Sequence, residues 1–131
     1  MEEQCPCGSG KTYDSCCGVF HNDITKVKTA EQLMRSRYTA FCKANGDYLI
    51  LSQHSSMIQP TMKYDLVRWA MSVKFMKLEI VDVQDGSEKD ETGEVEFNAF
   101  YMERFQSRCL HERSRFVKEN GHWVYLDAIK D

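Results

Sequence analysis

The stretch HERSRFVKENGHWVYLD, residues 111–127, contains the strongest turn signal in the sequence. Asn120 and Gly121 both tolerate positive φ, which a type I′ turn requires at its two central positions. The runs on either side contain β-branched and aromatic residues, so the stretch predicts a hairpin of two antiparallel strands, residues 109–118 and 122–129. Because side chains alternate along a strand, the turn also determines which side chains share a face of the sheet.

The register that follows from this turn assigns side chains to two faces. If Glu119 pairs with His122, then Phe116 pairs with Tyr125. Continuing the alternation places Ser114 opposite Asp127, so that one face carries Glu112, Ser114, Phe116, Tyr125 and Asp127. The opposite face carries His111, Arg113, Arg115, Val124 and Leu126. Each face therefore mixes apolar and ionisable side chains, which a plain hydrophobic core would not do.

The residues before this hairpin predict two further antiparallel strands. They are expected at residues 75–84 and 94–102, where apolar and polar side chains alternate, with a polar loop between them. A phase slip at Val81 indicates a β-bulge in the first strand. A second turn near residues 106–107 joins the second strand to the hairpin.

Three helices are expected upstream of the strands, at residues 30–45, 48–53 and 64–72. Thr29 and Gln32 form a capping box before the first helix, and Asp47 caps the second. Helices followed by an antiparallel meander predict an α+β fold, in which the helices pack on the concave face of a curved sheet.

Arg37 interrupts the apolar stripe of the first predicted helix. An unpaired buried guanidinium is costly, so Arg37 must meet a carboxylate or carbonyl groups. We predict that it pairs with Glu112 or Asp127 on the sheet, whereas Arg35 faces away. A structural ion pair is the simpler interpretation of this group. If a pocket lies between the helices and the sheet, Arg37, Tyr38, Glu112 and Asp127 are its candidate residues.

Four of the six cysteines lie in CPCGSGKTYDSCCG, residues 5–18. Ligand type and number predict a structural zinc site formed by Cys5, Cys7, Cys16 and Cys17, each thiolate about 2.3 Å from the ion. Both adjacent cysteines can bind one ion only if the backbone between them is turned. His21 is an alternative to Cys17 as the fourth ligand, although an exposed loop histidine is the simpler interpretation.

Three other chemistries remain open for these cysteines. A disulfide between Cys16 and Cys17 would be strained, and two disulfides between the pairs would require an oxidising compartment. Iron–sulfur clusters also accept four cysteines, but with different spacings.

Net charge and the N-terminal sequence argue against several other partners and locations. The 131 residues carry a formal net charge of −3, which gives no reason to expect a nucleic acid or an anionic membrane as partner. Four arginines gather near one hairpin, Arg104, Arg108, Arg113 and Arg115, but acidic residues interrupt them and a solvated strand face explains them better. The N-terminus has no positively charged region followed by an apolar one, so a cytoplasmic location without membrane insertion is expected.

Two segments of the chain resemble known families. Cys5 to Gly18 resembles the SEC-C motif, a small zinc-binding hook that contacts a partner protein in the bacterial preprotein translocase motor, although Asp14 and Ser15 stand where basic residues are common. The strings LMRSRYTAF (33–41), GDYL (46–49) and HERSRF…NGHWVYLD resemble the YchJ family. This resemblance implies a metal-binding hook at residues 1–20, a linker at 21–28 and a nuclear transport factor 2-like cone at 29–131.

Two functions are compatible with these features. The first is a zinc protein without catalytic activity, which binds a protein partner through the hook or a small molecule in the α+β pocket. The alternative is an isomerase- or hydrolase-like enzyme that uses the concave pocket, although Cys42 and Cys109 have no neighbouring histidine in a recognised nucleophile arrangement. A pocket open to solvent would favour use of the pocket, whereas a filled interior would not.

Overall fold

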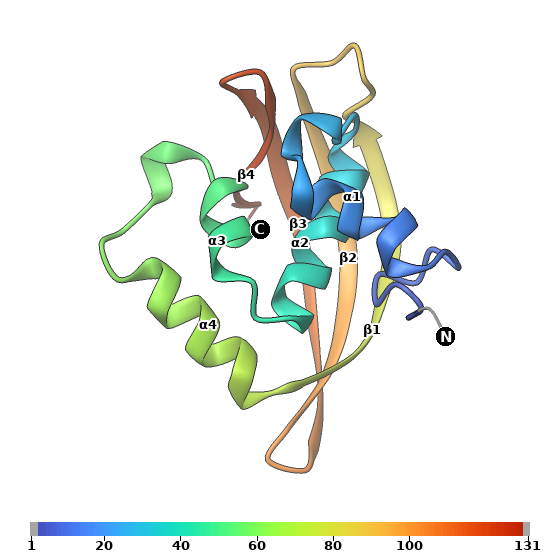
Figure 1. The fold of residues 1–131 in the computed structure, drawn as a ribbon, viewed down its shortest axis with the longest axis vertical. Coiled ribbons are helices and arrows are strands. Elements are labelled where there is room, and N and C mark those ends of the chain that lie inside the picture. Colours follow the sequence, from blue (N-terminus) through green and yellow to red (C-terminus); the bar gives the residue numbers. More distant parts are fainter. Residues whose placement is uncertain (1–2, 130–131) are drawn as a thin grey trace.

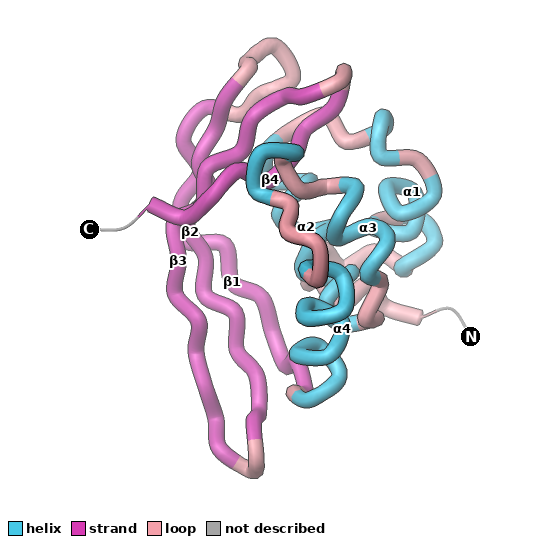
Figure 2. Tube along the Cα trace, turned by 90° about the vertical axis from the view of Figure 1, so that its left-hand side faces the viewer, coloured by secondary structure: helices cyan, strands magenta, loops and turns pink. Residues whose placement is uncertain are grey.

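The structure is a computed structural model that describes residues 3–129. Its sheet has four antiparallel strands in sequential order, β1 (Lys74–Asp85), β2 (Thr92–Glu103), β3 (Gln106–Glu119) and β4 (His122–Ile129). Figure 1 shows the helices in front of the sheet, and Figure 2 shows that they all cover its concave side. The predicted α+β fold with helices on a curved antiparallel sheet is confirmed.

The helical layer has four α-helices and three short 3₁₀ turns in the described residues. The α-helices are α1 (Cys17–Asn22), α2 (Ala30–Cys42), α3 (Gly46–Leu51) and α4 (Met62–Ser72). The 3₁₀ turns are η1 (Tyr13–Ser15), η2 (Ile24–Lys26) and η3 (Ser55–Met57). None of the helices in residues 3–129 combines the length and apolar character needed to cross a bilayer.

The segment expected to be a linker, residues 21–28, is packed against the α+β domain. It contains the end of α1 and all of η2, and Ile24 and Val27 are buried in the main hydrophobic core. Two apolar side chains three residues apart lie on one side of a helical turn, which is too short to give a detectable periodicity. The chain therefore passes from the hook to α2 through a folded connection.

Local signals explain where α2 begins and ends and where α3 begins. Thr29 Oγ1 accepts a hydrogen bond from the Gln32 backbone N–H at 3.1 Å, as predicted for the capping box. Helix α2 ends at Cys42, because Ala44 adopts a φ of 53°. The predicted cap of α3 is wrong: the side chain of Asn45, not Asp47, accepts from the Tyr48 backbone N–H at 3.1 Å.

The β3–β4 register agrees with the prediction only as far as Tyr125. Phe116 lies opposite Tyr125, but β4 then contains one extra residue, so Asp127 pairs with Arg115 and not with Ser114. The Tyr125 backbone N–H donates to the Ser52 carbonyl and its carbonyl accepts from the His54 N–H, both at 2.8 Å. Tyr125 is thus bonded to the segment after α3, at the point where the regular β3–β4 pairing is interrupted.

This bulge reverses the predicted orientation of Asp127. Because side chains alternate across a strand, one extra residue moves every later side chain to the other face. Asp127 therefore lies with Arg115 on the convex face, away from the helices. The bulge predicted at Val81 in β1 is confirmed by a register shift between Ile80 and Asp82.

A close approach between α2 and the β1–β2 hairpin sets the position of α2 on the sheet. The Ala30 N–H donates to the Gly86 carbonyl at 3.0 Å. A Cβ on Gly93 would lie 2.5 Å from the Gly86 Cα and 3.1 Å from the Ala30 Cβ. The chain therefore needs glycine at residue 93 to bring the helix this close.

We predict that Gly93→Ala destabilises the protein by about 1–3 kcal/mol, because the added methyl group overlaps backbone that cannot move away easily. Urea unfolding monitored by circular dichroism measures the change. Thr92→Ala is the control, since Thr92 is exposed on the same strand. Equal stability of the two variants would contradict the close approach.

Candidate functional site

Four cysteine sulfurs form a compact cluster in the hook. The Sγ atoms of Cys5, Cys7, Cys16 and Cys17 all lie within 4.8 Å of one another, and all but Cys16 are buried. Gln4 and Thr12 form an antiparallel bridge that brings the two cysteine pairs together. Cys16 has a φ of −126° and a ψ of −111°, so the backbone between the adjacent cysteines is turned and both sulfurs point inward.

The cluster is suited to metal binding because its thiols are free and one of them, Cys7, is acidified. None of the cysteines in the described residues forms a disulfide. The hydrogen bond from Cys17 lowers the pKa of the Cys7 thiol to about 4, whereas the pKa of Cys17 is raised by the same bond and by burial. The cluster therefore contains a thiolate at neutral pH, and thiolates are the ligands of metals. These four cysteines can hold a metal ion.

His21 lies beside the cluster but its ring nitrogens are occupied elsewhere. Nδ1 is 2.7 Å from the Tyr13 hydroxyl, and Nε2 is 2.8 Å from the Ser36 carbonyl oxygen. Since a carbonyl only accepts, Nε2 carries the proton and the Tyr13 hydroxyl donates to Nδ1. His21 is thus neither a ligand in this arrangement nor an exposed loop residue. It joins the hook to α2.

Two further contacts seat the hook on α2. Arg35 Nη1 donates to the Cys7 carbonyl at 2.6 Å, while its Nε bonds to Glu31 at 3.0 Å. Thr39 Oγ1 lies 3.7 Å from the Cys5 sulfur and Thr39 is fully buried. Arg35 does face away from the sheet, as predicted, but it faces the hook. The four-residue spacing of Arg35 and Thr39 marks a polar helix face to which sequence patterns alone assigned no partner.

Replacing Arg35 should loosen the hook. We predict that Arg35→Met lowers the stability of residues 5–18 by about 1.5–3 kcal/mol, because the Cys7 carbonyl loses a charged donor. Amide hydrogen exchange resolved by peptide measures this, and the exposed Arg68→Met is the control. Unchanged exchange in the hook of Arg35→Met would show that this bond does not hold it.

A cavity of about 320 Å³ lies between α2, α4 and the concave face of the sheet. Its lining is mostly apolar and aromatic and includes Phe41, Leu66, Trp69, Phe75, Ala99 and Tyr101. Of the candidate pocket residues, Arg37, Tyr38 and Glu112 line the cavity. Asp127 does not, because the bulge in β4 places it on the convex face.

Arg37 has no ion pair within the described residues, so the predicted pairing with Glu112 or Asp127 is wrong. Its Nη1 donates to the Leu49 carbonyl at 3.0 Å and to Ser52 Oγ at 2.8 Å. These acceptors come from the end of α3, where carbonyl groups lack helical partners. The guanidinium also lies 4.8 Å from the centroid of the Tyr125 ring. Burial lowers the pKa of Arg37 to about 10, so it remains a cation at neutral pH.

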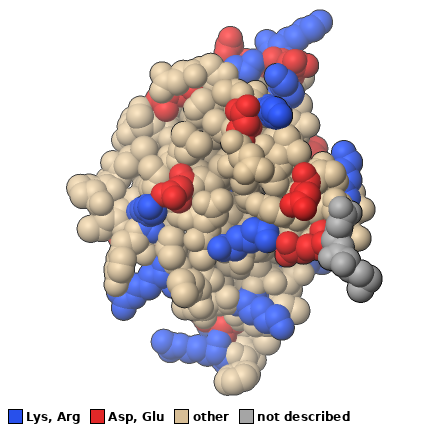
Figure 3. All heavy atoms as spheres, viewed as in Figure 1, with Lys and Arg blue, Asp and Glu red and all other residues tan. Residues whose placement is uncertain are grey.

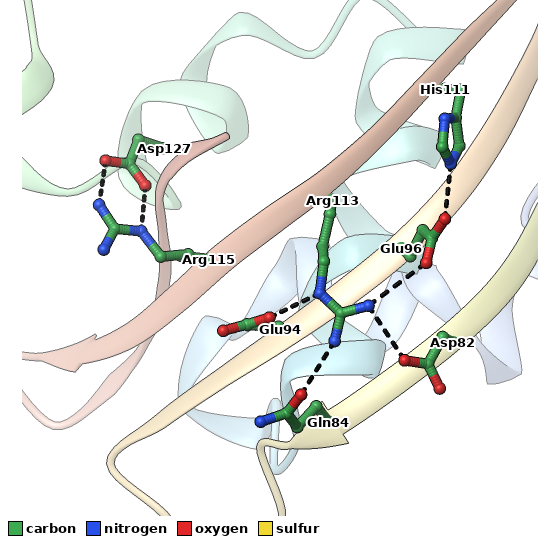
Figure 4. A network of polar contacts seen from close by, with 8 residues as sticks. All are labelled: Asp82, Gln84, Glu94, Glu96, His111, Arg113, Arg115 and Asp127. Carbon is green, nitrogen blue, oxygen red and sulfur yellow. Dashed lines mark hydrogen bonds and ion pairs between the residues drawn. The ribbon is translucent and has the colours of Figure 1, made fainter. Parts of the chain in front are cut away.

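The arginines of the convex face are already paired with acidic groups. Figure 4 shows Arg113 bonded to Asp82, Glu94 and Glu96, while Arg115 bonds to Asp127 at 2.5 and 2.6 Å. On the face that carries the helices, basic and acidic side chains are interspersed (Figure 3). This distribution gives no support to a nucleic-acid interface, which needs a continuous basic surface.

Comparison with known proteins identifies both parts of the chain. Residues 3–18 match the model of the SEC-C motif, and residues 29–128 match that of the YchJ middle NTF2-like domain. The chain belongs to the YchJ family. A UPF0225 protein of Vibrio parahaemolyticus is 45% identical over 128 residues, which cover 98% of this chain and 75% of that protein. A UPF0225 protein of Streptomyces coelicolor is 42% identical over 125 residues, covering 95% and 93%.

Two solved structures resemble this YchJ-family chain over most of its length. A SEC-C motif containing protein from Rhodopseudomonas palustris has a TM-score of 0.84 and 30% identity, covering 97% of this chain and 98% of that one. A SEC-C motif containing protein from Psychrobacter arcticus has a TM-score of 0.77 and 24% identity, covering 97% and 83%, and shows likeness of fold. The arrangement of hook and cone is thus shared with related proteins.

Proposed function

We propose that this chain is a non-enzymatic zinc protein in which Cys5, Cys7, Cys16 and Cys17 hold one structural Zn²⁺. The mutual proximity of the four sulfurs carries this proposal. Zinc bound tetrahedrally by four thiolates at about 2.3 Å requires sulfurs about 3.8 Å apart. The Cys7 and Cys16 sulfurs are 3.7 Å apart, so the cluster needs little rearrangement to accept the ion.

The role of the ion would be to fold the hook and present it on α2. The hook contributes no large apolar side chain to its own small cluster except the half-buried Tyr13. Metal ligation replaces the hydrophobic core that so short a segment cannot form. Four protein ligands leave no open coordination position, so the ion would not activate water. A reducing compartment such as the cytoplasm would keep the thiols available.

Substitution of single cysteines tests the metal site. We expect Cys16→Ser to lose the bound zinc and to unfold the hook while the sheet and its helices remain folded. Zinc released from the purified protein is measured with a chromophoric chelator, and the sheet is followed by amide hydrogen exchange. Cys42→Ser and Cys109→Ser are matched controls that should retain one zinc ion per chain.

Two results would contradict a four-cysteine zinc site. One is full zinc content in Cys16→Ser, and the other is absence of zinc from the reduced protein with all cysteines intact. Substitution by Co²⁺ gives a second measurement, since tetrahedral thiolate coordination has its own visible absorption.

The exposed residues of the hook support the proposal that it binds a protein partner. Gly8, Ser9, Gly10 and Lys11 are exposed while the neighbouring cysteine ligands face inward. A photo-crosslinking residue at Lys11 should therefore give a discrete crosslinked product in cells, and one at Lys89 in the β1–β2 loop should not. Identical labelling at both positions, or none at Lys11, would contradict docking through the hook.

The enzymatic alternative has weaker support than a binding function. Burial raises the pKa of the Cys42 thiol to about 11, which keeps it protonated and unreactive at neutral pH. Cys109 is exposed on β3 and lies outside the cavity lining. The cavity itself supports binding of a small molecule, and its polar groups allow the class of ligand to be inferred.

A further inference from the structure

Arg37 presents unused hydrogen-bond donors to the cavity. Its Nη1 is engaged by Leu49 and Ser52, but within the described residues its Nε and Nη2 have no protein acceptor. No fully buried side-chain nitrogen or oxygen in residues 3–129 lacks a partner. The free donors of Arg37, a residue only 6% exposed, are therefore not fully buried, and Arg37 lines the cavity. A desolvated cation with open donors is a strong attachment point for a ligand acceptor.

Glu112 presents an unused acceptor from the sheet. Its Oε2 accepts hydrogen bonds from Ser114 Oγ at 2.7 Å and from the Tyr125 hydroxyl at 3.4 Å. No hydrogen bond to Oε1 is made by the described residues. Both carboxylate oxygens can accept, so Oε1 is available to a donor in the cavity.

Tyr125 keeps these two charged groups apart. The Arg37 guanidinium packs over the Tyr125 ring, whereas the hydroxyl of the same ring reaches the Glu112 carboxylate. Arg37 and Glu112 consequently form no ion pair, although both line the cavity. A donor from α2 and an acceptor from β3, both in contact with the Tyr125 side chain, define the position for a polar group of the ligand.

The remaining wall is suited to an aromatic or other apolar group. Trp69 packs against Phe75 and Tyr101 with ring centroids 5.5 and 5.6 Å apart, and Phe41 lies 5.8 Å from Trp69. A volume of about 320 Å³ is at the lower end of the range for small-molecule sites. The site therefore fits a compact ligand with an apolar body.

We propose that the cavity binds an uncharged, compact molecule with an apolar or aromatic body and a head, such as a primary amide or a lactam, that carries adjacent acceptor and donor groups. The acceptor bonds to Arg37 and the donor to Glu112. One cation and one anion already balance in the cavity, so a neutral ligand leaves no net charge in an apolar site. An anionic head would meet Arg37 but would be repelled by Glu112.

The experiment compares two probes of nearly equal shape, phenylacetamide and phenylacetate, at pH near 7 with the full chain as purified. Binding is followed by tryptophan fluorescence, to which Trp69 in the cavity lining contributes, and by chemical shifts of cavity residues. We expect the amide to bind at least about ten-fold more tightly than the carboxylate, because each probe makes the Arg37 bond but only the amide can donate to Glu112.

Two carboxylate variants separate the contribution of Glu112 from general charge effects. Glu112→Gln should remove the preference and strengthen phenylacetate binding by about ten-fold, since a glutamine amide can donate to the probe. Asp127→Asn makes the same change of charge on the convex face and should leave both affinities unchanged. Ala99→Leu places a larger side chain in the cavity and should weaken both probes, which locates binding there.

Tighter binding of phenylacetate than of phenylacetamide by the unaltered protein would overturn the proposal in favour of an anion site. It would also be overturned if neither probe shifted cavity resonances at about 10 mM, or if Asp127→Asn acted as Glu112→Gln does. Thermal unfolding confirms that each variant is folded. None of these outcomes depends on the identity of the metal. The cavity proposal is therefore tested independently of the zinc proposal.

Discussion

Burial of α2 on two opposite sides is the constraint on which the rest of this structure depends. One side of the helix meets the sheet and the cavity, and the other side receives the hook through Arg35 and Thr39. The contact between Ala30 and the two glycines of the β1–β2 hairpin holds the helix at the depth that both sides require. A helix buried in this way must provide polar partners as well as apolar surface, because carbonyls and thiols of the hook would otherwise lose their hydrogen bonds to water.

Tyr125, like α2, joins several parts of the structure around the cavity. Its backbone bonds to the segment after α3, its ring supports the Arg37 guanidinium, and its hydroxyl reaches Glu112. The extra residue that follows it in β4 removes Asp127 from the cavity and places it beside Arg115. One irregularity therefore leaves a single carboxylate near Arg37, and this makes the cavity electrically balanced.

The hook and the cavity are separate sites that share one helix. A metal ion at the thiol cluster would stabilise the segment against which Arg35 and His21 bond, whereas the cavity is bordered by Arg37, Tyr38 and Phe41 on the sheet side. In this chain the SEC-C match precedes the match to the YchJ NTF2-like domain, and a SEC-C motif containing protein from Rhodopseudomonas palustris shares the fold over 97% of the chain. Both sites depend on the placement of α2.

Local sequence signals determined the elements that depend on near neighbours. Asn120 and Gly121 specify their turn, Thr29 caps α2, and the spacing of the four cysteines specifies a thiol cluster, because each of these features is decided within a few residues. Tertiary structure decided the other features: the partners of Arg37, the bulge after Tyr125 and the contact of Arg35 with the hook. Each joins segments distant in the chain: Arg35 reaches a carbonyl 28 residues away, and the Gln53 side chain bonds to Tyr125 across 72 residues. Alternation along a strand does not predict an extra residue next to a residue whose backbone is bonded to another segment. That extra residue decided which face of the sheet carries Asp127.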